Sequence, residues 1–162
     1  MKIYLGLGTN IGDRITNLND AKIYLNKHLK ITVIKESKVY ETSPMENKNQ
    51  DYFLNQVIEI KTDLNAYQLL NYIQEIELIM GRNHTEKKYF PRTIDIDILS
   101  FKHLNIDIDD LKIPHTKINS RKFVLKPWSD IASHYILPNS NLTIKQLLDN
   151  ISHLSDEIRE YN

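Results

Sequence analysis

The sequence predicts an α+β fold in which an antiparallel sheet carries helices packed on one face. Four segments have the apolar, β-branched composition of strands, two segments between them carry apolar residues at helical spacing, and the six segments follow the order β-α-β-β-α-β. The predicted strands are residues 2–10, 31–42, 51–62 and 93–101, and the predicted helices follow Asp13 and Asn65. This order is the ferredoxin-like βαββαβ arrangement.

The first strand, KIYLGLGTN (2–10), is apolar and runs into a glycine-containing turn. The glycine spacing over residues 6–12 matches neither a Walker loop nor the dinucleotide-binding fingerprint, so we interpret this stretch as a tight turn. Asp13 can cap the following helix, because its carboxylate accepts hydrogen bonds from free backbone N–H groups. The apolar stripe of this helix consists of Ile15, Leu18, Leu25 and Leu29.

The next two strands are predicted to form an antiparallel pair joined by a long loop. Residues 31–42 alternate in polarity and are rich in β-branched side chains, and Ser43-Pro44 ends the strand. Residues 45–50 are polar and read as the loop, and residues 51–62 form the returning strand.

The second helix is predicted to start at a cap formed by Asp63 or Asn65 and to reach Met80. Gly81 suits the C-terminal cap, where a left-handed backbone conformation is common. The residues expected to face inward are Leu69, Leu70, Ile73, Ile76 and Met80.

The residues after the fourth strand are predicted to be C-terminal additions to this unit. They comprise a hairpin at 102–113, a basic loop at 114–120, a helix starting near Ser120, and a short helix from Thr143 to Leu148. Pro127 is expected to bend or end the first of these helices. The polar segment 151–162 is expected to fray. No linker is visible, so we expect a single domain over residues 1–162.

The composition excludes several classes of protein. With 162 residues, 41% of them hydrophobic, the chain can bury one ordinary core. A formal net charge of zero argues against nucleic acid and membrane partners, and the lack of cysteine excludes disulfides and thiolate metal sites. The apolar stretch Ile3 to Leu7 is too short for a signal peptide or a membrane span. We therefore expect a cytoplasmic protein.

The sequence IDID occurs twice, and the first copy lies in the fourth strand. Asp95 and Asp97 point to the same face of a strand, roughly 6–7 Å apart, so their charges need either water or a cation between them. A strand with one wet face explains the pattern as well as a metal site does. Asp107 and Asp109, in the second copy, have polar neighbours and read as solvated surface.

Two basic segments flank the first copy. Residues 82–92 hold four Lys or Arg against one acid, and residues 112–126 hold five Lys or Arg and no acid. Carboxylates that hold Mg²⁺, with cations around them, are the arrangement that binds a polyphosphate. On the preceding strand, Phe53 and Asn55 share one face and could stack on and hydrogen-bond a flat heterocycle, although a core Phe beside a surface Asn also explains them.

Motifs along the chain carry a resemblance to a known family. They are GLGTNIGD (6–13), YETSP (40–44), FLN (53–55), QEIELIMGR (74–82), PRTIDIDIL (91–99), IPH (113–115) and the pair Arg121 and Phe123. PRTIDIDIL has the form of the family's signature, P-R-x-[ILV]-D-[ILV]-D-[ILV]. Over nearly its whole length, the chain resembles the 6-hydroxymethyl-7,8-dihydropterin pyrophosphokinase family of folate biosynthesis.

The resemblance implies the reaction and its catalytic residues. The enzyme would transfer the diphosphate of ATP to the hydroxymethyl group of the pterin and release AMP. Asp95 and Asp97 would bind two Mg²⁺ ions, with ATP as the co-substrate. Arg82 and Arg92 would join them as catalytic residues that hold phosphates.

The resemblance also implies the binding residues. The pterin would lie between Phe53 and Phe123, with Thr42, Met45, Asn55 and Tyr89 completing its site. The residues implied for ATP are Gln74, Glu77, His84, Lys88, Arg92, Ile98, His115, Thr116 and Arg121. Gln74 and Glu77 are three residues apart on the predicted helix and therefore share a face.

The chain departs from the family pattern in the 82–92 segment. Better-known bacterial members carry Arg at the positions of His84 and Lys88, and Trp-Gly at Tyr89-Phe90. Lys88 keeps the charge but loses the bidentate geometry of Arg. Thr116 replaces a common aromatic residue. We therefore expect weaker ATP affinity or slower closure over the substrates, with activity retained.

Two other classes remain possible from the residues alone. A palm-like or cyclase-like nucleotidyl transferase also places metal-binding aspartates on a ferredoxin-like sheet, but it would release pyrophosphate. A ferredoxin-like RNA-binding module would need exposed aromatic residues on the sheet, and the neutral charge argues against it. We expect a monomer whose partners are ATP and the pterin.

Overall fold

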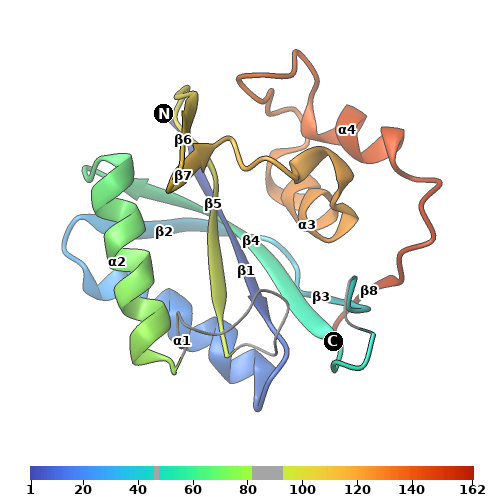
Figure 1. Cartoon of the computed structure of the whole chain (residues 1–162), viewed down its shortest axis with the longest axis horizontal. Helices are drawn as coiled ribbons and strands as arrows, with labels where there is room; N and C mark the ends of the chain where they lie inside the picture. The colour runs from blue at the N-terminus through green and yellow to red at the C-terminus, as the bar shows by residue number, and fades with distance from the viewer. Residues whose placement is uncertain (46–47, 82–92) are drawn as a thin grey trace.

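The computed structural model describes residues 1–45, 48–81 and 93–162. Figure 1 shows a central six-stranded sheet in the order β5-β1-β4-β3-β8, with β2 also paired with β4. The strands are β1 (Ile3–Thr9), β2 (Ile31–Glu36), β3 (Tyr40–Thr42), β4 (Phe53–Thr62), β5 (Asp95–Phe101) and β8 (Ile158–Glu160). Every pair in the sheet is antiparallel, which confirms the predicted ferredoxin-like core.

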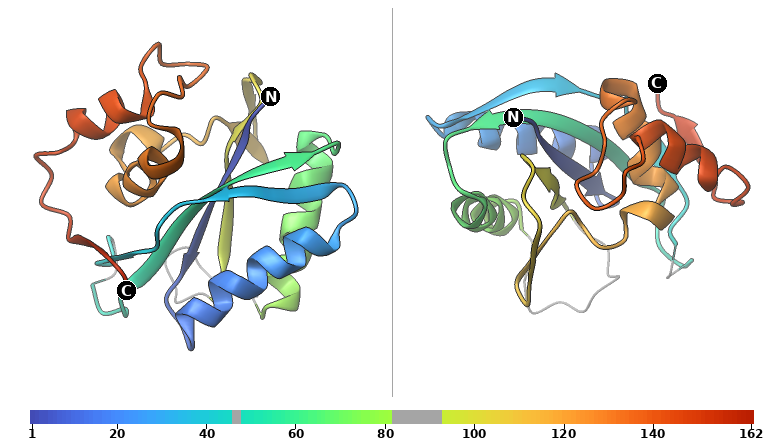
Figure 2. Two further views of the ribbon diagram at one scale, coloured as in Figure 1. Left: turned by 180° about the vertical axis from the view of Figure 1, so that it is seen from behind. Right: turned by 90° about the horizontal axis from the view of Figure 1, so that it is seen from above.

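The described residues form four α-helices, which flank the sheet. They are α1 (Arg14–Lys27), α2 (Ala66–Ile79), α3 (Lys122–Ala132) and α4 (Ile144–Asn150). Figure 1 and the turned views in Figure 2 show α1 and α2 at one side of the strands and α3 and α4 at the other. The small hairpin of β6 (Ile106–Ile108) and β7 (Leu111–Ile113) and the 3-10 helix η1 (Ile118–Ser120) connect β5 to α3. In the described parts of the chain, no helix is both long and apolar enough to cross a bilayer.

The predicted strand 31–42 is divided at Ser37 into β2 and β3. The Ser37 N–H donates to the Val57 carbonyl at 2.9 Å, and the Ser37 hydroxyl accepts from the Val57 N–H at 2.9 Å. A side-chain oxygen thus takes the place of a backbone acceptor, so β4 stays hydrogen-bonded while its partner strand bends.

The helix caps follow the sequence expectations. Asp13 accepts a hydrogen bond from the Thr16 N–H at 3.1 Å. Asn65 caps α2 in a reciprocal capping box with Gln68, which decides between the two caps considered for this helix. Thr143 caps α4. These polar contacts satisfy N–H groups that the first helical turn leaves unpaired.

The sheet separates two hydrophobic cores. The larger core lies between the sheet and the helices α1 and α2, and it contains alternate residues of β1 such as Ile3, Leu5 and Leu7. The smaller core lies on the other face under α3 and α4, where the fully buried Trp128 packs on Tyr4 and Tyr135 with ring centroids 5.2 and 5.8 Å away. One face of β1 is therefore covered along its length and the other is covered at Tyr4, which fixes its register with β4 and β5.

The structure contradicts two sequence expectations and removes one of the two alternatives given for Pro127. Leu29 is fully exposed, because α1 ends at Lys27 and Leu29 lies beyond its apolar stripe. Pro127 does not end its helix, since α3 continues to Ala132. The polar segment 151–162 does not simply fray: residues 158–160 form β8, which pairs with β3 at the edge of the sheet.

Candidate functional site

A cavity of about 440 Å³ opens between the sheet, the segment after β3 and the start of α3. Its volume is within the range of small-molecule sites. The sheet contributes Gly6, Gly8, Thr42, Phe53, Asn55, Asp95 and Asp97. The segment after β3 contributes residues 43–45 and Gln50, and the third wall contains Lys117, Ser120, Arg121 and Phe123. The cavity thus combines carboxylates, cations and aromatic rings from segments far apart in the sequence.

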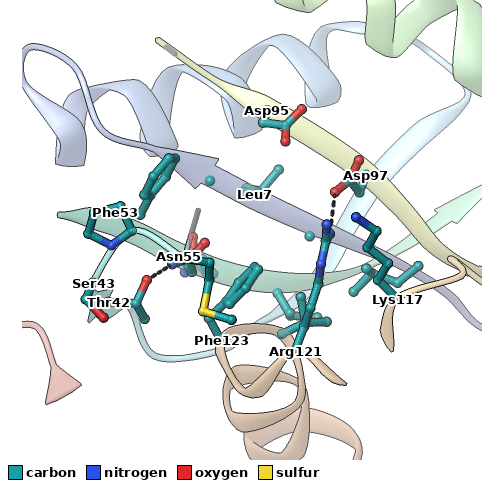
Figure 3. Close-up of a pocket in the computed structure, with 18 of the residues that line it drawn as sticks. Leu7, Thr42, Ser43, Phe53, Asn55, Asp95, Asp97, Lys117, Arg121 and Phe123 are labelled. Atoms are coloured by element: carbon teal, nitrogen blue, oxygen red, sulfur yellow. Dashed lines mark hydrogen bonds and ion pairs between the residues drawn. The ribbon is translucent and has the colours of Figure 1, made fainter. Parts of the chain in front are cut away.

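Asp95 and Asp97 both line this cavity, whereas Ile96 and Ile98 are buried in the core under α1 and α2. The prediction that the two carboxylates share a face is therefore confirmed. Figure 3 shows them projecting from β5 over β1. By contrast, Asp107 of the second IDID copy is exposed and pairs with Lys112 at 2.9 Å, which confirms its interpretation as surface.

Glycines lie beside the two aspartates on the neighbouring strand. Gly6 pairs in register with Asp97, and Gly8 pairs with Asp95. A Cβ on Gly8 would lie 3.2 Å from the Asn55 Oδ1 atom, and a Cβ on Gly6 would lie 3.3 Å from a Leu99 methyl group. Because glycine has no side chain, β1 leaves space next to the two carboxylates, and any other residue at these two positions would fill that space.

Two basic side chains approach Asp97. Its Oδ2 atom lies 3.9 Å from His115 Nε2 and 4.0 Å from Arg121 Nη1. The Arg121 guanidinium also lies 5.5 Å from the centroid of the Phe123 ring. Arg121 therefore stands between the carboxylate pair and the aromatic part of the cavity, as Figure 3 shows.

The aromatic part of the cavity is organised around Asn55. Its Nδ2 atom donates to the Thr42 hydroxyl at 2.7 Å, and this buried contact fixes the orientation of the amide. In Figure 3 the rings of Phe53, from β4, and Phe123, from α3, lie on different sides of Asn55. Two aromatic faces with an oriented amide between them suit a flat ring with polar edges.

The pair of aspartates is suited to bind Mg²⁺ that is also coordinated by the phosphates of a substrate. Within residues 1–45, 48–81 and 93–162, no group of three or more His, Cys, Asp or Glu side chains is placed to hold a metal ion. Mg²⁺ does not need such a cage, because it keeps several waters and binds through one or two carboxylates plus substrate phosphates. Asp95 and Asp97 supply those carboxylates, and Arg121 and Lys117 lie on the opposite wall.

Glu77 supports the strand that carries the aspartates. Its side chain is buried, and Oε1 accepts a hydrogen bond at 3.2 Å from the N–H of Ile96, the residue between Asp95 and Asp97. A helix of the larger core is thereby tied directly to β5, which holds the backbone of both aspartates.

The remaining predicted residues are distributed over several places. Thr42 and Met45 line the main cavity, and His115 and Thr116 line a neighbouring cavity of about 240 Å³. Gln74 is exposed on α2, and Ile98 is buried in the larger core. Arg82, His84, Lys88, Tyr89 and Arg92 lie outside the described residues, as do the other positions of the 82–92 segment.

Some cavity residues were not singled out from the sequence. Lys117 and Ser120 belong to the basic segment 112–126, so its charge signalled their region but not these two positions. Gly6 and Gly8 were interpreted only as part of a turn. Their role follows from the cross-strand register with β4 and β5, which the sequence of β1 alone does not contain.

Comparison with known proteins identifies relatives along most of the chain. The family described as 7,8-dihydro-6-hydroxymethylpterin-pyrophosphokinase matches residues 4–133. The 2-amino-4-hydroxy-6-hydroxymethyldihydropteridine pyrophosphokinase of Bacillus subtilis is 45% identical over 128 residues, which cover 79% of this chain and 76% of that protein. The bifunctional protein FolKE of Lactococcus lactis is 43% identical over 126 residues, which cover 76% of this chain but only 35% of the longer protein.

Solved structures share the fold. A structure described as HPPK-DHPS in complex with substrates matches with a TM-score of 0.73 at 17% identity, covering 94% of this chain and 43% of that chain. The Plasmodium falciparum HPPK-DHPS matches with a TM-score of 0.71 at 20% identity, covering 92% of this chain and 43% of that chain. From the family match over residues 4–133 and the 45% identity to the Bacillus subtilis enzyme, the chain belongs to the 7,8-dihydro-6-hydroxymethylpterin-pyrophosphokinase family.

Proposed function

We propose that the protein transfers the diphosphate of ATP to the hydroxymethyl group of 6-hydroxymethyl-7,8-dihydropterin, in the synthesis of folate. The observation that carries this proposal is a single cavity that contains both Asp95 and Asp97 and the Phe53–Asn55–Phe123 group, in a chain that belongs to this family. One part of the cavity suits a magnesium-bound polyphosphate, and the other suits a flat heterocycle.

In the proposed reaction the hydroxymethyl oxygen attacks the β-phosphorus of ATP. A bond forms between these two atoms, and the bond from the β-phosphorus to the oxygen that bridges the α- and β-phosphates breaks. AMP leaves with that oxygen, the hydroxyl proton passes to solvent, and the products are the pterin diphosphate and AMP. Because the transition state carries its charge on phosphate oxygens, positioning and electrostatic stabilisation dominate the catalysis.

The pterin site consists of groups that are already oriented. Phe53 and Phe123 bind the two faces of the ring by stacking, and the Asn55 amide, held by Thr42, hydrogen-bonds its edge. Since the amide is fixed before the ligand arrives, little side-chain freedom is lost on binding. Met45 covers the side of the cavity formed by the segment after β3.

The phosphate site lies next to it on the sheet. Asp95 and Asp97 would hold magnesium, and the bound ion would supply neutralisation of phosphate charge and a more electrophilic β-phosphorus. Arg121 and Lys117 bind phosphate oxygens from the opposite wall of the cavity. In the structure Arg121 lies 4.0 Å from Asp97, so we propose that it moves only a short way to meet the phosphates.

Three finer points belong to the same proposal. ATP-dependent diphosphate transfer is the family's chemistry, and we propose that Asp95 and Asp97 would hold two Mg²⁺ ions, which would neutralise the charge of the triphosphate. We propose that residues 1–162 form one pyrophosphokinase domain. We further propose that it acts as a monomer in the cytoplasm.

The test is a product analysis with ATP, Mg²⁺ and the hydroxymethyl pterin. AMP and pterin diphosphate are expected to form in equal amounts, and removal of magnesium with EDTA should stop both. ADP as the nucleotide product would indicate an ordinary kinase. Release of pyrophosphate without a pterin requirement would support the palm-like nucleotidyl transferase instead.

The two IDID copies provide a matched pair of variants. Asp97→Asn removes one carboxylate charge from the cavity without changing side-chain size, and we expect turnover to fall by about two orders of magnitude or more. Asp107→Asn makes the same change at an exposed position and should leave turnover unchanged. Loss of turnover in Asp107→Asn alone would show that the wrong copy has been assigned to the metal.

A further inference from the structure

The C-terminal strand β8 encloses the outer edge of β3. Glu41 and Arg159 are register partners in this pair. The pairing extends beyond the strands at both ends, since the Tyr161 N–H donates to the Val39 carbonyl at 2.9 Å and the Ser43 N–H donates to the Glu157 carbonyl at 3.3 Å. The backbone of β3 is therefore held on one side by β4 and on the other by β8.

A buried carboxylate links β8 to the start of α1. Glu41 is 7% exposed, and it pairs with Arg14 Nη2 at 2.7 Å and accepts from Arg159 Nε at 2.9 Å. The hydrogen bonds from Arg159 and Arg14 lower the pKa of Glu41, so the carboxylate stays charged at neutral pH. Two arginines from opposite ends of the chain thus converge on one residue of β3.

The same groups hold the chain where it returns to the sheet at β4. Arg14 Nη1 donates to the Tyr52 carbonyl at 2.8 Å, and the Tyr52 hydroxyl donates to Glu157 at 2.6 Å. Asn10 Nδ2 donates to the Asp51 carbonyl at 3.3 Å. Residues 50–52 are therefore attached both to the β1–α1 turn and to the segment that leads into β8.

The other side of these segments forms one wall of the main cavity. Thr42, Ser43, Pro44, Met45, Gln50 and Phe53 all line it, directly beside the residues that the arginine–glutamate network holds. Figures 1 and 2 show β8 and the C-terminus next to the segment that follows β3. Any movement of β3 would displace Thr42, and with it the hydrogen bond that orients Asn55.

We propose that Arg159 and Glu41 are positioning residues for the pterin, and that β8 is a functional part of its binding site. This inference rests on the proposed function of the cavity. Arg159 does not line the cavity, and it acts by fixing Glu41, and therefore Thr42 and the segment after it, in the geometry that fits the ring. Because β8 contributes no residue to the buried part of either core, its effect is local.

The test compares Arg159→Ala with Lys38→Ala. Lys38 Nζ pairs with Glu160 at 3.1 Å, so the control removes another exposed ion pair between the same two chain segments, away from Glu41. We expect Arg159→Ala to raise the KM for the pterin about two- to fivefold, the effect expected for losing one partly exposed ion pair. The KM for ATP should stay within error in both variants, the melting temperature of Arg159→Ala should fall by no more than about 2–4 °C, and Lys38→Ala should match wild type throughout.

Further measurements separate positioning from general stability. Arg159→Lys keeps a cation and should recover part of the pterin KM, and deuterium exchange in Arg159→Ala should rise in residues 42–45 and 48–53 but not in β1. An unchanged pterin KM in Arg159→Ala, with normal AMP formation by wild type, would overturn this inference and leave the proposed function intact. Equal rises in both KM values, or a fall in melting temperature that accounts for the change, would also overturn it. Wild type that forms no AMP would instead refute the proposed function.

Discussion

Gly8 offers a direct test of how the cavity recognises a flat ring. A methyl group at this position would lie 3.2 Å from the Asn55 Oδ1 atom, which is closer than ordinary van der Waals contact. The amide cannot easily turn away, because its Nδ2 atom is held by the Thr42 hydroxyl at 2.7 Å. Gly8→Ala should therefore push the Asn55 amide out of place by a few tenths of an ångström, which is enough to weaken a hydrogen bond to a ligand.

The size of the effect follows from one neutral hydrogen bond. Such a bond contributes about 0.5–1.5 kcal/mol, which corresponds to a rise of about two- to tenfold in the KM for the pterin. Stability should change little, because the backbone entropy that alanine saves at this ordinary strand position offsets the crowding at Asn55. Lower pterin affinity in an equally stable protein is thus the expected result.

A double-mutant cycle checks the physical cause. If Gly8→Ala acts through the Asn55 amide, it should have little further effect in an Asn55→Ala background, where the crowded atom is absent. Initial rates at varied pterin and saturating ATP give the required KM values. Additive effects of the two changes, or an unchanged pterin KM in Gly8→Ala, would refute the reasoning.

Three further predictions concern the frame around the cavity. Asn65→Ala removes the capping box shared with Gln68 and should destabilise the protein by about 1 kcal/mol in urea unfolding, without changing either KM. Glu77→Ala leaves the buried Ile96 N–H without this acceptor; it should cost about 1–3 kcal/mol in the same assay and raise the magnesium concentration needed for half-maximal rate. The Glu41→Gln variant should be less stable than wild type at pH 7. Because folding lowers the pKa of Glu41, the stability that its charge contributes is present above the ordinary pKa of 4.5 and is lost as the pH falls through the lowered pKa. Urea unfolding from pH 7 to pH 3 should therefore show the stability difference between the two proteins vanish.

The βαββαβ core was predictable because its signals are local. The alternating polarity within residues 31–42, the cap at Asn65 and the helical spacing of Leu69, Ile73 and Ile76 each lie within a few residues of one another. The division of the predicted strand at Ser37 was not predictable. It depends on a side-chain contact with Val57, twenty residues further along the chain.

The same distinction explains what was missed at the C-terminus. β8 has only three residues, mostly exposed, so no apolar pattern marks it as a strand. What stabilises it is pairing with β3 and the contact of Arg159 with Glu41, which are 118 residues apart. Local composition carries no signal for interactions at that sequence separation, so a fraying polar tail was expected in place of a strand.

For the site, the residue pattern made candidates of Asp95, Asp97, Phe53 and Asn55, and the resemblance then favoured the metal and pterin interpretations and added Phe123. Pattern alone left Asp95 and Asp97 equally consistent with a wet strand face. The structure places them beside bare glycine backbone and opposite Arg121, a combination that needs the register of β1 with β5 and the approach of α3.

The buried position of Trp128 makes its intrinsic fluorescence a local probe of unfolding. Trp128 is the only tryptophan in the chain, and it belongs to α3, where its side chain enters the smaller core one to two turns after Arg121 and Phe123. Tyr4 and Tyr135 are close enough to transfer excitation energy to it. Its emission therefore reports on the α3 side of the sheet alone, whereas circular dichroism averages over the whole chain. Coinciding transitions in the two signals would show that both sides of the sheet melt as one cooperative unit.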